Sequence, residues 1–207
     1  MLDAHRYSLF FIAALILAAT PGPGIFYVLA RTLAGGRREG ILSSLGTFAG
    51  GLFHVVAAAL GISAILAASA VAFHAVKYAG AAYLVWLGIR MIRTGNAELP
   101  VGTFVLSRGA FVQGIVTEVL NPKTALFFLS FIPQFISPQL GHIFLQFFIL
   151  GAVTVVLNTT ADLLVVSLAV PLGGMLRTNA AFRRRQRMAS GFGMIGLGAY
   201  VALTDTK

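Results

Sequence analysis

The sequence has no cysteine, few charged residues and very few acidic ones. Of its 207 residues, 10% are charged and only six are Asp or Glu, whereas about 25% of the residues in an ordinary soluble domain are charged. The absence of cysteine excludes disulfide bonds, cysteine–zinc sites and thiol nucleophiles. The chain also lacks a Gly-rich phosphate loop and an HExxH metal motif. We therefore expect no metal, no cofactor, no ATP drive and no enzymatic activity.

Apolar residues are what the sequence has in abundance. Hydrophobic residues make up 58% of the chain, about 120 in all, and the mean hydropathy is +0.90. A soluble protein of this length cannot bury so many apolar side chains, but a bilayer can, since a spanning helix takes about 20 apolar residues. The composition predicts an all-α integral membrane protein with six transmembrane helices. It excludes a soluble enzyme, a secreted disulfide scaffold and a disordered chain.

Six apolar runs can be delimited along the chain. They cover about 7–30, 40–66, 70–91, 109–135, 142–168 and 189–203. Hydrophilic stretches at 93–108 and 177–187 separate the third run from the fourth and the fifth from the sixth. No room remains for a soluble domain, so we predict a single membrane domain over 1–207. The first run could be a cleaved signal peptide, but its length and its return to apolar residues after Gly24 favour an uncleaved helix.

The basic residues predict the orientation of the chain in the membrane. The net charge is +9, and most of the 15 Lys and Arg residues fall in three connecting segments. These are Arg31, Arg37 and Arg38 in the first, Arg90, Arg93 and Arg108 in the second, and Arg177, Arg183, Arg184, Arg185 and Arg187 in the third. By the positive-inside rule these segments are cytoplasmic and both termini lie outside. The run at 183–187 could bind nucleic acid, but contact with membrane lipid headgroups is favoured.

Two of the apolar runs are broken by prolines at matching positions. Pro21-Gly22-Pro23-Gly24 interrupts the first run and Asn121-Pro122-Lys123 the fourth, about half the chain length apart. They predict two half-repeats, about 1–95 and 105–207, inserted with opposite orientation because each half holds three spans. Paired breaks of this kind are typical of transporter sites, because broken backbone inside a bilayer must face protein or a water-filled cavity. Proline kinks with no ligand role are the alternative.

Two acidic residues, Glu118 and Asp162, fall inside predicted spans. Charge is costly at bilayer depth, so such residues usually face a cavity or a partner. Glu118 lies one helical turn before Asn121, on the same face beside the second break. It could carry a proton, or it could form an ion pair with Lys123 that would make it a poor proton carrier. The sequence leaves both open. Lys77, near the outer end of the third run, is expected to extend its ammonium to the membrane surface.

Polar or small residues recur at every fourth position in the fifth and second runs. These are Thr154, Asn158 and Asp162 in the fifth run, and Gly46, Gly50 and His54 in the second. The polar stripe could line a pathway or join two helices by hydrogen bonds, and the ionisable Asp162 favours a pathway. The two glycines permit close helix approach. His54 could relay protons, although a neutral, hydrogen-bonded histidine is the more common role.

Four segments together resemble a known family. They are TPGPG at 20–24, GTFAGG at 46–51, KYAGAAYLVWLGIR at 77–90 and NPKTALFFLSFIPQF at 121–135. Over nearly its whole length the chain resembles the lysine exporter/RhtB family of bacterial amino-acid efflux proteins. The resemblance implies a small inner-membrane carrier with inverted three-helix repeats. It also implies export of amino acids or derivatives driven by the proton gradient, and a homodimer.

The family motifs map onto both helix breaks. They match Pro21, Gly22 and Pro23 in the first break, and Asn121, Pro122 and Lys123 in the second. The chain departs from the family pattern at two positions. The family often has Asp or Asn where this chain has Gly24, and Asn where it has Glu118. One break therefore lacks a polar group and the other gains a carboxylate.

These observations predict a secondary transporter that exports a small amino acid or derivative in exchange for protons, and they favour a neutral type such as threonine, homoserine or leucine. The candidate substrate-binding residues are Pro21, Gly22, Pro23, Gly24, Asn121, Pro122, Lys123 and Asn158. The candidates for proton coupling are Glu118, Asp162 and His54. The alternatives are an inorganic-ion transporter, a passive channel and a membrane scaffold that transports nothing.

Overall fold

The computed structural model describes residues 4–20, 22–68, 70–93, 109–178 and 180–203, which are almost entirely helical. The α-helices are α1 (Ala4–Ala19), α2 (Pro23–Ala68), α3 (Ala70–Arg93), α4 (Ala110–Val119), α5 (Pro122–Ser130), α6 (Ile143–Thr178) and α7 (Ala180–Leu203). Two short 3-10 helices, η1 (Ile132–Phe135) and η2 (Pro138–Leu140), connect α5 to α6. No strand occurs in these described ranges. The all-α fold predicted from the composition is therefore confirmed.

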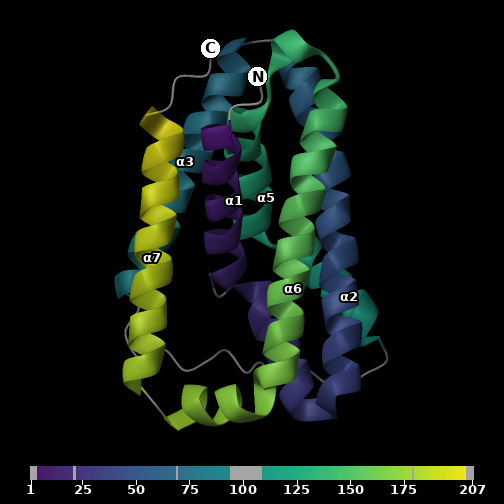
Figure 1. Ribbon diagram of the computed structural model, residues 1–207, viewed down its shortest axis with the longest axis vertical. Helices are drawn as coiled ribbons and strands as arrows, with labels where there is room; N and C mark the ends of the chain where they lie inside the picture. Colours follow the sequence, from purple (N-terminus) through teal and green to yellow (C-terminus); the bar gives the residue numbers. More distant parts are fainter. Residues whose placement is uncertain (1–3, 21, 69, 94–108, 179, 204–207) are drawn as a thin grey trace.

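The long helices run side by side along the long axis of the molecule (Figure 1). On one side α3 packs against α7, and on the other α2 packs against α6 and α4. Between them lie α1, which contacts α6 and α7, and α5, which contacts α3. The start of α1 and the end of α7 lie at the same end of the molecule, and we call it the terminal end.

Several of these helices are apolar enough for a bilayer. Within the described ranges, Pro23–Gly61 and Ile143–Ala169 have the length and hydropathy of membrane-spanning helices. The bent pair Ala110–Val119 and Pro122–Phe135, whose two parts meet at 49°, counts as a third span if taken together. Tyr7–Ala19 and Gly191–Leu203 are shorter apolar helical stretches. This is compatible with a membrane protein, while the arrangement as six spans in two inverted repeats stays a prediction.

Both predicted breaks coincide with helix boundaries. The first separates α1 from α2, and the second separates α4 from α5. Asn121 caps α5, because its side-chain oxygen accepts a hydrogen bond from the backbone N–H of Lys123 at 3.1 Å. Pro122 follows at the start of the helix, where its missing N–H costs nothing.

The helix α2 consists of two arms joined at Gly36. This residue has φ 78° and ψ −175°, a conformation inside α2 that favours glycine because it has no Cβ. We call 23–35 the short arm and 37–68 the long arm. The expected connecting segment between the first and second apolar runs is therefore a sharp turn between two helical arms. The two arms of α2 meet at the end of the molecule opposite the terminal end (Figure 1).

The structure corrects two expectations about basic residues. The arginine-rich stretch expected between the fifth and sixth spans is largely helical, since α6 continues to Thr178 and α7 begins at Ala180. Arginine is a good helix former, and hydrophilicity alone did not indicate a break. Lys77 does not extend to a surface, because its side chain is only 2% exposed. It packs inside the helix bundle with its ammonium 5.5 Å from the Tyr78 ring centroid.

Glycines allow α2 and α4 to cross closely, as predicted for Gly46 and Gly50. A Cβ at Gly46 would overlap the carbonyl oxygen of Phe111, and one at Gly50 would lie 2.8 Å from Cβ of Glu118. From the opposite helix, a Cβ at Gly114 would lie 2.6 Å from the carbonyl oxygen of Ser43. The crossing presses α4 against the long arm of α2 and so fixes the position of Glu118.

Aromatic side chains from α1, α5, η1 and α6 fill part of the core. The buried rings are Phe10, Phe127, Phe128, Phe131, Phe135 and Phe147. Phe127 stacks on Phe131 with ring centroids 4.8 Å apart, and Phe131 contacts Phe135 at 4.9 Å. Such pairs add to the stabilisation from burial itself. These rings join α1, α5 and α6 in one apolar core.

Candidate functional site

A small cavity lies where the two helix breaks meet α2 and α6. Its volume is about 30 Å³, which is room for about two water molecules. The residues that line it come from five helices and from the second break. They are Ala18, Gly24, Ile25, Thr47, Gly51, Glu118, Asn121, Lys123, Thr124, Val155, Asn158, Thr159 and Asp162. Segments that are far apart in the sequence thus supply one polar interior site, which we call the break cavity.

Glu118 is held by neutral donors. Its side chain is 6% exposed. Oε1 accepts a hydrogen bond from the Thr124 hydroxyl at 2.7 Å, and Oε2 accepts one from Nδ2 of Asn121 at 3.0 Å. Within the part of the chain that the structure describes, no lysine or arginine nitrogen lies within 4.0 Å of this carboxylate. The alternative of a direct ion pair with Lys123 is therefore not realised here.

Lys123 instead joins the second break to the first. Its Nζ donates hydrogen bonds to the carbonyl oxygens of Thr20, at 2.8 Å, and Leu17, at 3.2 Å. Both carbonyls belong to the end of α1, where helix carbonyls lack partners within the helix and where the helix dipole favours a cation. An ammonium has three N–H groups, so one donor remains for another acceptor.

The α6 side of the break cavity carries acceptors. The Thr47 hydroxyl lies 2.8 Å from Oδ2 of Asp162 and 2.9 Å from the carbonyl of Ser44, and it can donate to either. Oδ1 of Asn158 is buried and has no hydrogen-bond partner among the described residues. Thr154, the third member of the predicted stripe, donates to Leu150 in its own helix and is absent from the cavity lining. Asn158 and Asp162 are therefore the stripe residues that face the cavity.

His54 contacts the backbone beside the site. Its Nε2 lies 2.8 Å from the backbone carbonyl oxygen of Glu118. A carbonyl can only accept, so Nε2 must carry a hydrogen and donate. The ring also lies beside Phe128, with centroids 6.1 Å apart. This arrangement orients the histidine toward the α4 backbone, and its role in proton transfer stays a prediction.

The glycines of the first break pack against side chains of the second. A Cβ at Gly22 would lie 3.1 Å from Nζ of Lys123, and one at Gly24 would lie 2.9 Å from Oε2 of Glu118. Pro23 and Pro122 are exposed and start their helices. Pro21, also predicted to bind substrate, lies outside the described residues. Of the predicted substrate residues, Gly24, Asn121, Lys123 and Asn158 therefore line the cavity.

Comparison with known proteins identifies the family. The family model described as "LysE type translocator" matches residues 15–205, which is nearly the whole chain. The chain belongs to the LysE type translocator family. The resemblance that the sequence motifs indicated is thereby confirmed. The chain matches a translocator family, a relative over its full length is named as a membrane protein, and its helices are apolar enough to span a bilayer. It is therefore a multi-pass membrane protein of a transporter family.

Several relatives of this LysE type translocator cover most of its length. It is 32% identical to an uncharacterized membrane protein of Vibrio cholerae over the full length of both chains. It is 33% identical to a homoserine/homoserine lactone efflux protein of Salmonella typhimurium, over 72% of this chain and 73% of the relative. It is 30% identical to a leucine efflux protein of Salmonella choleraesuis, over 70% of each chain. No solved structure matches the chain.

Sequence reasoning missed Thr47 and Thr124, the two threonines of the translocator's break cavity whose hydroxyls lie within hydrogen-bond distance of its carboxylates. Both lie in segments that carry the family resemblance, so the motifs point to them. A threonine in an apolar helix usually bonds to its own backbone, however, and the residue type alone predicts no role. Among the described residues, no three His, Cys, Asp or Glu side chains are grouped so that they could hold a metal ion.

Proposed function

We propose that this translocator exports a small neutral amino acid, or a close derivative, from the cytoplasm across the bacterial inner membrane in exchange for protons. Family membership and the printed names of the homoserine and leucine efflux relatives support amino-acid export. The observation that carries the proposal is the break cavity, where one ammonium from α5 and two carboxylates from α4 and α6 line one interior site beside both helix breaks.

The cavity offers complementary groups for both ends of an α-amino acid. The remaining N–H of Lys123 would hold the substrate carboxylate. Asp162 and the unpartnered Oδ1 of Asn158 would hold the substrate ammonium. The rest of the lining includes Ala18, Ile25, Gly51 and Val155. An apolar or small surface of this kind suits a neutral side chain better than that of lysine or arginine.

Transport requires the cavity to open, since about 30 Å³ cannot hold an amino acid. We propose that the chain has six spans in two inverted halves, and that one half rocks against the other. Lys123 spans the two breaks by its hydrogen bonds to Leu17 and Thr20. Because the same ammonium would hold the substrate carboxylate with its remaining N–H, substrate binding and movement of the two halves would be linked.

Two carboxylates that have no ionic partner among the described residues support the proposal of proton exchange. Glu118 and Asp162 are both buried, at 6% and 5% exposure. Inside a membrane such a group takes either a proton or a cation as its partner. We propose that Asp162 alternates between a proton and the substrate ammonium, with Glu118 as the second candidate and His54 as a relay. Each export step would then return a proton to the cytoplasmic side.

The proposal is tested by counterflow in proteoliposomes. Purified protein would be preloaded with unlabelled threonine, homoserine, leucine or lysine, and uptake of the same labelled compound would be followed with and without a pH gradient. We expect accelerated exchange for the neutral compounds and accumulation only with the gradient. Asp162→Asn should keep exchange measurable but abolish gradient-driven accumulation, while Asp205→Asn, near the chain end, serves as the matched control.

Three outcomes would contradict the proposal. Exchange of none of these compounds by folded protein would favour an inorganic ion or another organic solute. A flux that does not saturate as the concentration of any compound rises, and that does not depend on the pH gradient, would indicate a channel. Unchanged coupling in Asp162→Asn and Glu118→Gln alike would show that the proton is carried elsewhere.

A further inference from the structure

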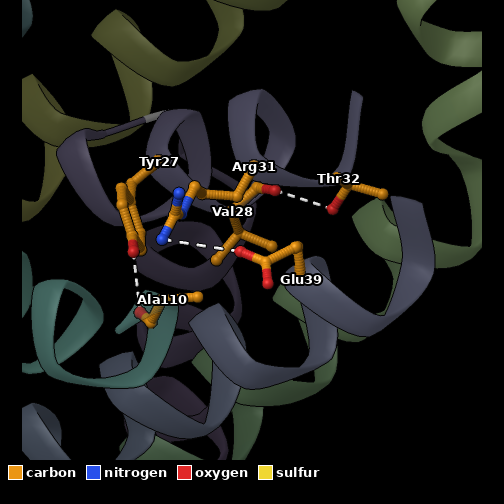
Figure 2. Close-up of polar contacts among 6 residues, drawn as sticks. All are labelled: Tyr27, Val28, Arg31, Thr32, Glu39 and Ala110. Carbon is orange, nitrogen blue, oxygen red and sulfur yellow. Dashed lines mark hydrogen bonds and ion pairs between the residues drawn. The ribbon is translucent and has the colours of Figure 1, made fainter. Parts of the chain in front are cut away.

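Arg31 is buried, although the sequence places it among the basic residues of a connecting segment. It lies on the short arm of α2, and its side chain is only 1% exposed. The neighbouring Arg37 and Arg38 are exposed, as expected for that segment. Figure 2 shows the Arg31 guanidinium beside the Tyr27 ring, whose centroid is 5.9 Å from Cζ of Arg31.

The guanidinium has fewer partners than its burial requires. Nη2 of Arg31 lies 3.5 Å from Oε2 of Glu39, across the Gly36 turn (Figure 2). Nε and Nη1 are buried and have no hydrogen-bond partner among the described residues. Burying donors of a charged group without partners is costly, so such groups in a native protein require an explanation, for example a functional role or a bound ion. A guanidinium holds a carboxylate in two parallel hydrogen bonds along its Nε–Nη2 edge or its Nη1–Nη2 edge. Both edges include Nη2, which faces Glu39, so another carboxylate can bind Arg31 in this way only by replacing that of Glu39.

Arg31 shares a helix face with the break cavity. Gly24 lines the cavity, and Arg31 lies seven residues further along the same arm. Seven residues are two helical turns, so the two positions face the same way about 10 Å apart. Tyr27 lies between them on this face, and its hydroxyl donates to the carbonyl oxygen of Ala110, at the start of α4, at 2.7 Å.

The long arm of α2 supplies a second polar row between the same two places. Glu39, Ser43 and Thr47 recur at every fourth position. Glu39 contacts Arg31 and Thr47 lines the break cavity. Ser43, between them, is fully buried, and its hydroxyl has no hydrogen-bond partner in the described ranges. Two helical arms thus present polar groups along one line from Arg31 to the cavity.

We propose that Arg31 is a separate binding site for the substrate carboxylate, on the cytoplasmic side of the break cavity, and that Glu39 occupies it in the closed conformation. This inference rests on the proposed amino-acid export. Glu39, 28% exposed, covers the guanidinium from the side of the Gly36 turn. When the turn opens, the substrate carboxylate replaces the Glu39 carboxylate on Arg31. The substrate then moves past Ser43 to the cavity.

The test uses two charge-removing variants with opposite expected effects. In inverted membrane vesicles, whose cytoplasmic face is outside, Glu39→Gln removes the internal competitor and should lower the KM for the exported amino acid at least threefold. Arg31→Gln removes the site and should raise this KM about tenfold, and Arg31→Lys should raise it less. Right-side-out vesicles should show an unchanged KM for all three, and Arg38→Gln should match the wild type on both faces.

The carboxylate requirement is tested with the amide of the same amino acid, which keeps the ammonium but has no carboxylate. At the cytoplasmic face of the wild type the amide should inhibit transport of the amino acid only weakly. In Arg31→Gln the inhibition constants of the amide and of the unlabelled amino acid should be more similar. If Arg31→Gln does not fold, the lowered KM of Glu39→Gln still carries the test.

The two proposals fail in distinguishable ways. If wild-type vesicles transport amino acids but Glu39→Gln and Arg31→Gln both raise the KM, or change only the amount of folded protein, the pair is a structural clamp. The inference about Arg31 is then wrong and the proposed function stands. If wild-type vesicles transport no amino acid, the proposed function fails, and the carboxylate site named here fails with it.

Discussion

Gly24 and Glu118 lie against each other between the two halves of the chain, because a Cβ at Gly24 would lie only 2.9 Å from Oε2 of Glu118. These are the two positions where the sequence departs from the pattern it otherwise resembles. The departures are therefore one structural feature. The space that a side chain at residue 24 would take is filled by a carboxylate from the other half.

This contact predicts that Gly24 tolerates no side chain beside Glu118. Gly24→Ala should lower kcat/KM for the exported amino acid about tenfold, because the carboxylate must shift from its bonds to Asn121 and Thr124. Counterflow in proteoliposomes measures the loss. Glu118→Asp, combined with Gly24→Ala, shortens the acid and should recover part of the activity. Gly61→Ala is the control, since no atom of the described residues lies within 4 Å of a Cβ there. Full activity in Gly24→Ala would contradict the tight contact.

Lys123 should contribute to stability as well as to transport. Lys123→Met removes both hydrogen bonds to the end of α1 and leaves two buried carbonyls without this donor. We expect the free energy of unfolding to fall by about 3 kcal/mol. Denaturant-induced unfolding in detergent, followed by the near-ultraviolet circular dichroism of the aromatic core, measures it. Arg184→Met, at an exposed position of α7, should change it by no more than about 0.5 kcal/mol. Equal stabilities for the two variants would refute the link between the breaks.

The Thr47 hydroxyl should matter through Asp162, to which it lies at 2.8 Å. Thr47→Val keeps the shape but leaves Oδ2 of Asp162 without this donor, so the KM should rise about tenfold and proton coupling should weaken. Thr47→Ser keeps the hydroxyl and should stay within about twofold of the wild type. Uptake at a series of external pH values, in all three proteins, is the measurement. A valine variant that behaves like the serine variant would assign Thr47 to packing alone.

The absence of cysteine makes the proposed orientation easy to test. Arg38→Cys and Gln139→Cys each introduce a single thiol at an exposed position, on opposite sides of the predicted membrane. In intact cells a membrane-impermeant maleimide should label Gln139→Cys and leave Arg38→Cys unlabelled until the membrane is opened. The reverse pattern would show that the chain has the opposite orientation in the membrane. Labelling of both variants in sealed cells would show that residue 38 is not on the cytoplasmic side.

Much of the fold could be predicted because it depends on local sequence. Long apolar runs specify helices, Pro122 and Asn121 start α5, and proline and glycine end α1. The arginine-rich stretch was misjudged for the same reason, since hydrophilic residues form helices as readily as loops. The prediction that Lys77 extends its ammonium to the membrane surface was wrong, because helix packing, and not the position along the span, decides what surrounds an ammonium.

The site itself required the tertiary structure. Sequence spacing placed Glu118 beside Asn121, since a helix brings residues one turn apart to one face. It left open whether Glu118 pairs with Lys123, because the partners of that ammonium, Leu17 and Thr20, lie in the other half of the chain.

The sequence by itself determined the class of protein, the two breaks and the family, since composition, helix-breaking residues and motifs depend on local sequence and not on how the helices pack. Only the tertiary structure decided that Lys123 holds the end of α1, that Thr47 reaches Asp162, and that Arg31 is buried. Each of these depends on how the helices pack, and packing joins residues that no local pattern connects.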